Sequence, residues 1–173
     1  MIRTLLGPTL MVASLMLGAG LARAAEAVDT TTVLVNLHQS NEKEIAMGKL
    51  AQKKGGSAEV KSFGKTLVKD HTAADKKVMK LAKEEELDLG STPHVDFDGA
   101  VAKMAGETDF DRRFAQTMLD EHDKAIESAK SAEDNTSDAK LKNLLIEIVP
   151  VLRKHRDVAQ RLVDHTMPSA QKY

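Results

Sequence analysis

The chain has 173 residues, with 25 basic and 26 acidic side chains and no cysteine. This balance excludes a protein held to nucleic acid by a basic surface, and the lack of cysteine excludes disulfides. Aromatic residues are scarce (four Phe, one Tyr and no Trp), whereas Ala, Leu, Lys, Glu and Met are common. Such a composition favours helices over strands.

The first segment has the pattern of a secretory signal. Arg3 gives it a positive start, an uncharged apolar run extends to Leu21, and a small-x-small pattern ends at Ala24. We therefore predict a signal peptide at residues 1–24, cleaved after Ala24, and export to the periplasm. The alternative is an uncleaved anchor in the inner membrane. Cleavage leaves residues 25–173 as one domain with a net charge of −3 (23 basic against 26 acidic), without stable membrane insertion.

Turn residues predict four long helices in the remaining chain. The first extends from about Thr31 to Lys54, where two glycines close it, and the second follows Ser57 as N-cap and extends to about Glu86. A long connection is expected over 88–109, with a short helix at 99–105. The third helix is expected from Thr108 or Asp109 to about Ala132. The fourth is expected from Ser137 or Asp138 to about Thr166. Two short turns and a longer crossover between the second and third helices predict an all-α fold, an antiparallel four-helix bundle.

Three of these helices carry a histidine on their apolar stripe. His71, His122 and His155 occupy positions where steps of three and four otherwise place aliphatic residues, and Glu44 lies on the corresponding line of the first helix. A buried imidazole without hydrogen-bond partners costs about 1–3 kcal/mol, so three of them in one core suggest a common purpose.

Two interpretations of these four residues follow. Imidazole and carboxylate together suit a divalent transition metal, so Glu44, His71, His122 and His155 are candidate ligands for Zn, Cu, Mn or Fe. In the alternative, the histidines bond acids on neighbouring helices and fix the register of a structural or partner-binding bundle of the cell envelope, used under stress. The sequence identifies no protein partner and does not distinguish a monomer from a homo-oligomer.

Counting residues from the turns gives the expected geometry. Glu44 and His71 differ by three residues in their distance from the first turn, which is about 4–5 Å along the helix axis. Counted from Thr136, His122 and His155 differ by five residues, or about 7–8 Å. A site with two or three ligands is therefore favoured over one that uses all four residues.

Other chemistry finds little support. Carboxylate-bridged di-iron bundles need a Glu three residues before a His, and Val68, Leu119 and Leu152 stand there instead. No nucleophile motif, phosphate-binding loop or dinucleotide fingerprint is present, so no enzymatic activity is assigned. Met118, one turn before His122, either offers copper a thioether or fills the core. His38 and His165, near helix ends, are expected in solvent.

Several short motifs indicate a resemblance to a known family: Lys-Asp-His at 69–71, Phe-Asp at 110–111, His122, and Pro-x-x-x-x-His at 150–155. With them, the chain resembles the exported bacterial proteins grouped as domain of unknown function 4142, over about Thr32 to Val163. The resemblance implies a ferritin-like four-helix bundle and an exported location. It implies no reaction, although ferritin-like proteins often bind metals.

Overall fold

The helices begin and end close to the turn residues that punctuate the sequence. The computed structural model describes residues 28–91 and 97–166; the predicted signal peptide at residues 1–24 lies outside them. Within these two ranges the fold consists of helices and contains no strand, so the prediction of an all-α fold is confirmed. The elements are α1 (Thr30–Lys54), α2 (Ala58–Glu84), the 3-10 turn η1 (Leu89–Ser91), α3 (Asp98–Ala105), α4 (Phe110–Asn135) and α5 (Ala139–Thr166).

Capping interactions explain several of these boundaries. The Ser57 hydroxyl accepts a hydrogen bond from the Val60 backbone N–H at 3.2 Å, as the sequence predicts for an N-cap. Asp138 caps α5 in the same way, accepting from the Leu141 N–H at 3.1 Å. Helix α2 ends two residues earlier than expected, because Glu86 takes a φ of 56°, in the left-handed region that stops a helix.

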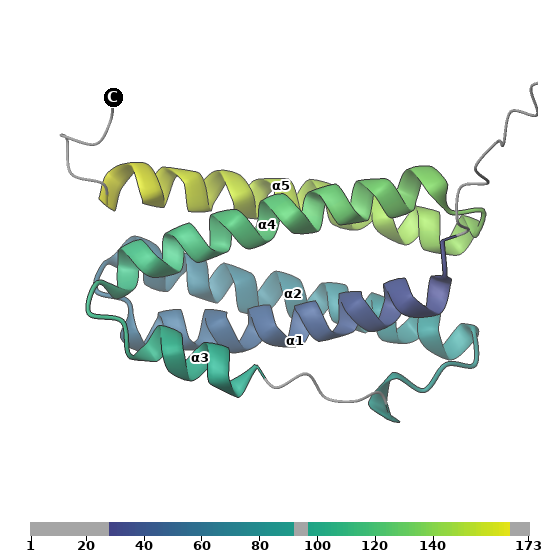
Figure 1. Ribbon diagram of the computed structural model, residues 1–173, viewed down its shortest axis with the longest axis horizontal. Helices are drawn as coiled ribbons and strands as arrows, with labels where there is room; N and C mark the ends of the chain where they lie inside the picture. Colours follow the sequence, from purple (N-terminus) through teal and green to yellow (C-terminus); the bar gives the residue numbers. More distant parts are fainter. Residues whose placement is uncertain (1–27, 92–96, 167–173) are drawn as a thin grey trace, which may run out of the picture.

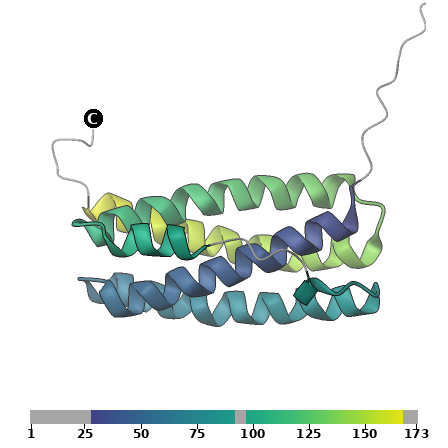
Figure 2. The same cartoon turned by 60° about the horizontal axis from the view of Figure 1, so that its bottom comes forward.

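The four long helices lie side by side, in two pairs of chain neighbours (Figures 1 and 2). Residues 55–57 join α1 to α2, residues 136–138 join α4 to α5, and α3 lies beside the first pair. In the first pair the backbones approach so closely that a Cβ built on Gly64 would stand 2.6 Å from the Gly48 carbonyl oxygen. Glycine is therefore required at this crossing.

Asp111 connects the turn of the first pair to the start of α4. Its carboxylate accepts hydrogen bonds from the backbone N–H groups of Gly56 and Ser57, both at 2.8 Å. Burial alone would raise the pKa of Asp111, but these hydrogen bonds lower it below its usual value. The Phe-Asp pair at 110–111 thus holds the two helix pairs together at one end.

The hydrophobic core forms two separate clusters along the bundle. One, around Phe63, Phe114 and Leu162, lies toward the turn at 55–57; the other, around Leu34, Val78 and Leu145, lies toward the turn at 136–138. Between the two clusters, each long helix contributes buried polar side chains. These are Asn41, Glu44, His71, His122 and His155. The polar residues therefore form a layer across the middle of the molecule.

None of the helices within 28–91 and 97–166 combines the length and the apolar character that a bilayer span requires.

Candidate metal centre

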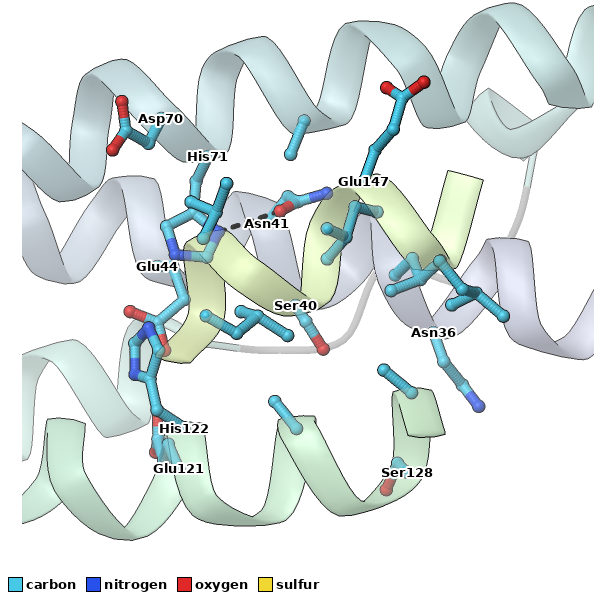
Figure 3. A pocket seen from close by; sticks show the side chains of 18 of the residues that line it. Asn36, Ser40, Asn41, Glu44, Asp70, His71, Glu121, His122, Ser128 and Glu147 are labelled. Carbon is cyan, nitrogen blue, oxygen red and sulfur yellow. Dashed lines mark hydrogen bonds between the residues drawn. The ribbon is translucent and has the colours of Figure 1, made fainter. Parts of the chain in front are cut away.

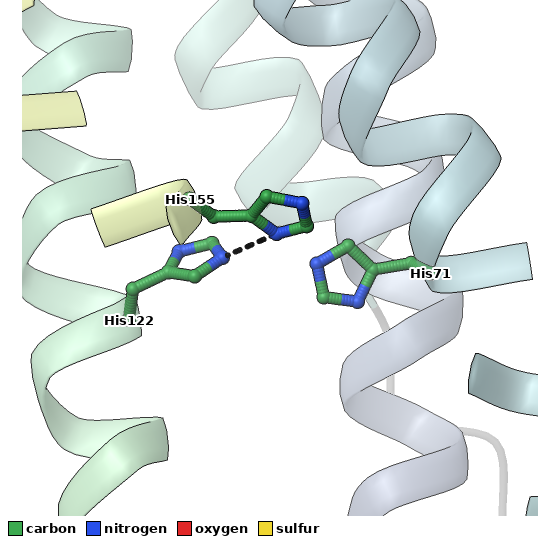
Figure 4. Close-up of side chains that lie close together, drawn as sticks. All are labelled: His71, His122 and His155. Carbon is green, nitrogen blue, oxygen red and sulfur yellow. Dashed lines mark hydrogen bonds between the residues drawn. The ribbon is translucent and has the colours of Figure 1, made fainter. Parts of the chain in front are cut away.

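The histidines from three helices converge in this layer. One ring nitrogen from each of His71, His122 and His155 belongs to a group of atoms that all lie within 4.8 Å of one another (Figure 4). The ring centroids are 5.8 Å apart for His71 and His122, 5.2 Å for His71 and His155, and 5.3 Å for His122 and His155. All three side chains are buried.

Each histidine is anchored by its other ring nitrogen to an oxygen atom. His71 Nδ1 donates to the side-chain oxygen of Asn41 at 2.9 Å, and His122 Nδ1 donates to the backbone carbonyl of Met118 at 2.9 Å. His155 Nε2 donates to the Asp70 carboxylate at 3.1 Å. Such outer hydrogen bonds fix the tautomer and the orientation of a ligating imidazole.

These anchors decide which nitrogens carry lone pairs. A neutral imidazole has one N–H and one acceptor nitrogen. With the N–H groups of all three rings directed outward, His71 Nε2, His122 Nε2 and His155 Nδ1 present lone pairs to a common centre. His71 Nε2 is buried and has no hydrogen-bond partner in the part of the chain that the structure describes.

The closest pair of nitrogens fits a bound cation. His122 Nε2 and His155 Nδ1 are 3.3 Å apart, the contact drawn as a dashed line in Figure 4. When both rings are neutral and donate to their anchors, neither of these two nitrogens carries a proton to share. Two facing lone pairs repel, and a positive charge between them removes the repulsion. Two nitrogens bound to one tetrahedral metal at about 2.0–2.1 Å stand roughly 3.3–3.4 Å apart. The residues present therefore fit a transition metal ion, with a ring nitrogen of His71 within 4.8 Å of those of the other two histidines.

Burial keeps these imidazoles uncharged. Loss of solvent, reinforced by repulsion from the neighbouring histidines, lowers the pKa of His71 to about 3. Burial and His155 likewise lower the pKa of His122 to about 4. Burial also lowers the pKa of His155, although Asp70 opposes the shift. No proton competes with a metal for these nitrogens near neutral pH.

A cavity of about 660 Å³ extends from the surface to His71 and His122 (Figure 3). Its walls are mostly apolar and come from α1, α2, α4 and α5. Within residues 28–91 and 97–166, three buried polar atoms on residues that line the cavity have no hydrogen-bond partner: Asn41 Nδ2, Glu44 Oε2 and His71 Nε2. Unsatisfied polar atoms around a cavity indicate a place for a polar ligand, water or ion.

Glu44 lies beside the histidines but outside their close group. Its side chain is buried and lines the same cavity, yet among the described residues the group of mutually close ligand atoms contains only the three histidines. Burial raises the pKa of Glu44 to about 8, and the neighbouring Glu121 adds to the shift.

The histidines are closer together than the sequence count predicts. An axial separation of about 7–8 Å between His122 and His155 was expected from a turn centred at Thr136. The observed helix ends, Asn135 and Ala139, place the centre of the turn at residue 137. Counted from residue 137, His155 is 18 residues away and His122 is 15 residues away. The difference of three residues corresponds to about 4–5 Å along the helix axis, which imidazole side chains span easily.

The same count identifies a residue that sequence reasoning missed. Asn41 and His71 both lie fifteen residues from Gly56, so they face each other across the first pair of helices. Asp70 was noted only as part of a motif, yet it anchors His155 on another helix. The expectation that His38 is in solvent is wrong: it is largely buried and hydrogen-bonded to Asp75 at 2.8 Å. His165 is exposed, as expected.

Comparison with known proteins gives a family. The family model described as "Domain of unknown function (DUF4142)" matches residues 17–162. The chain belongs to this family. A comparison with curated proteins finds no match.

Solved structures of CopM are similar to this DUF4142 protein. CopM in the Cu(I)-bound form has a TM-score of 0.70 at 16% identity, over 82% of this chain and 99% of that chain. The apo form has a TM-score of 0.68 at 17% identity, over 80% of this chain and 98% of that chain. The Cu(II)-bound form has a TM-score of 0.65 at 17% identity, over 80% and 98%. At such identities the likeness shows the fold alone.

Proposed function

We propose that this DUF4142 protein binds one transition metal ion, copper in the first place, through His71, His122 and His155. The observation that carries the proposal is the orientation of the three rings. Each has one nitrogen fixed by an oxygen acceptor, and the other nitrogen faces the shared centre. Register alone would require hydrogen bonds between helices but not three lone pairs directed at one point.

The choice of copper rests on chemistry and on analogy. Imidazole ligands suit Cu, Zn, Fe and Ni, and among divalent ions Cu²⁺ forms the most stable complexes with such ligands. CopM, which shares the fold, has been solved in Cu(I)-, Cu(II)- and Ag-bound forms. The proposed role is metal binding rather than catalysis, carried out after export to the periplasm by an antiparallel four-helix bundle of the ferritin-like type.

The test is metal binding by the purified apo protein. We expect one Cu²⁺ per chain, with nitrogen superhyperfine splitting in the electron paramagnetic resonance spectrum. His71→Gln, His122→Gln and His155→Gln should each weaken binding by at least about tenfold. His165→Gln, which alters an exposed histidine near the end of α5, is the matched control and should leave binding unchanged.

Two outcomes would contradict the proposal. One is the absence of stoichiometric copper on the wild-type protein; the other is equal binding by the wild-type protein and the three core variants. If the core variants change the melting temperature by the same amount with and without metal, the histidines serve as register residues of a structural bundle.

A further inference from the structure

The cavity links exposed residues at its rim to the buried histidines. Asn36, Ser40 and Glu147 are exposed where the cavity meets the surface, whereas His71 and His122 are buried within it (Figure 3). An ion that enters from solvent along this cavity therefore reaches two of the three imidazoles. His155 is not among the described residues that line it.

Two carboxyl groups lie along this route. Glu121 on α4 precedes His122, and its side chain is 27% exposed. Glu44 on α1 lies one turn after Asn41, the anchor of His71, and is only 6% exposed. The two carboxyl groups interact with each other, and Glu44 Oε2 has no hydrogen-bond partner among the described residues. Glu121 is thus partly exposed, whereas Glu44 is buried like the histidines.

A lysine already holds one of these carboxylates. Lys43 Nζ contacts Glu121 Oε1 at 2.5 Å, and Lys43 also lines the cavity. The ammonium group balances the negative charge of Glu121. The Lys43 ammonium thus occupies a cation-binding position beside Glu121, from which another cation can displace it.

We propose that Glu44 and Glu121 form a loading site, at which a copper ion from solvent first binds and from which it passes to the three histidines. This inference rests on the function proposed above and assigns the two glutamates a role outside the final coordination. Carboxylate oxygens exchange ligands readily and attract a hydrated cation, whereas imidazole nitrogens hold copper more tightly. The ion therefore moves from oxygen to nitrogen ligands, and Lys43 competes with it for Glu121.

Association kinetics test the loading site. Apo protein is mixed with copper(II) sulfate in a stopped-flow instrument, and the ligand-field absorption of the histidine complex is followed. Glu121→Gln should lower the association rate constant by about tenfold or more, since local charge raises on-rates by that order. Glu44→Gln should lower it as well, although Glu44 carries a proton near neutral pH, because the variant lacks the carboxyl oxygen that exchanges this proton for the ion. Lys43→Gln should raise it. The equilibrium affinity should change little in all three variants, because the dissociation rate constant changes by about the same factor as the association rate constant.

Glu147→Gln is the matched control for Glu121→Gln, because it removes one negative charge from the exposed rim of the same cavity. Unchanged association rates for Glu44→Gln and Glu121→Gln, in a protein that binds copper normally, would overturn the loading site alone. A loss of equilibrium affinity at an unchanged association rate would also overturn it, and would make Glu44 a permanent ligand. A wild-type protein that takes up no copper would overturn the proposed function as well. A decrease equal to that of Glu147→Gln would reduce the effect to net charge and reject the specific site.

Discussion

The three anchors of the histidines differ in their exposure. Asn41 and the Met118 carbonyl are buried, but the Asp70 side chain is 30% exposed. Removing Asp70 therefore disturbs the centre without opening a cavity in the core. In the resulting protein His155 is free to turn and to place its proton on either ring nitrogen.

We expect Asp70→Ala to weaken copper binding by about 10–100-fold, the usual effect of losing an outer hydrogen bond to a ligating histidine. The free energy of unfolding of the apo protein should change by less than about 1 kcal/mol, because the lost interaction is partly solvated. Copper titration and urea unfolding measure the two quantities. Asp75→Ala is the control, since Asp75 lies on the same helix but bonds His38. Equal affinities for the two variants would show that Asp70 does not position the ligand.

At this scale the sequence identifies the chemistry but not the contacts. The position of three histidines on apolar stripes is visible as an interruption of the 3.6-residue period, so the residues themselves were predictable. Their partners were not, because a hydrogen bond such as that of Asp70 to His155 depends on how two helices face each other. Among these partners only Asn41 could have been predicted, because Asn41 and His71 lie equally far along the chain from the turn at Gly56.

Among the helices, the contact of α1 with α2 depends on two glycines. The Cβ of an alanine at position 64 would lie 2.6 Å from the Gly48 carbonyl oxygen and 2.8 Å from the Ala51 Cβ. These neighbours are a backbone atom and the first atom of a side chain, so neither can move without shifting the helix.

We expect Gly64→Ala to destabilise the protein by about 1–3 kcal/mol, the usual cost of overpacking, even though alanine favours a helix by about 1 kcal/mol over glycine. Gly99→Ala, in α3, is the matched control: none of the described residues has an atom within 4 Å of the added Cβ, beyond the chain neighbours of Gly99 and the backbone of α3, so stability should not fall. Urea unfolding of both variants gives the comparison. A stable Gly64→Ala protein would mean that the two helices can separate without loss.

Helix boundaries were the most predictable feature, since Ser57 and Asp138 are local capping signals. The end of α2 was less so. Glu86 adopts a left-handed conformation that its residue type does not favour. No adjacent glycine or proline indicates in the sequence that the helix ends there. The relative height of His122 and His155 was missed for a similar reason: an error of one residue at the centre of a turn moves the estimate by two.

Across the whole molecule, the polar layer between the two apolar clusters gives stability a dependence on pH with two opposite contributions. The buried histidines have pKa values of about 3 for His71 and about 4 for His122, against 6.5 in the unfolded chain. Below pH 6.5 the unfolded state binds more protons than the folded state, so stability falls as the pH falls. Glu44 has a pKa of about 8 when folded and 4.5 when unfolded. Between these values the folded state binds the extra proton, so stability falls as the pH rises.

These contributions predict a maximum of stability near pH 6.5 for the metal-free protein. Each fully shifted group changes the free energy of unfolding by at most about 1.4 kcal/mol per pH unit. Between pH 4.5 and 6.5 the histidines outnumber Glu44, and the slope is positive; between 6.5 and 8 Glu44 acts alone, and it is negative. Urea unfolding of the apo protein from pH 4.5 to 8.5 measures the curve.

The two sides of the maximum can be removed separately. Glu44→Gln should abolish the decrease between pH 6.5 and 8 and leave the acid side in place. His71→Gln and His122→Gln should each flatten the acid side, since a glutamine does not titrate. Bound copper, unlike these histidine variants, should leave the acid side in place, because a ligated nitrogen accepts no proton in the folded state whereas the histidines of the unfolded chain still do. A curve that falls steadily from pH 8 to 4.5 in both the wild-type protein and Glu44→Gln would show that Glu44 is ionised in the folded state, and that the polar layer contains more water than its burial indicates.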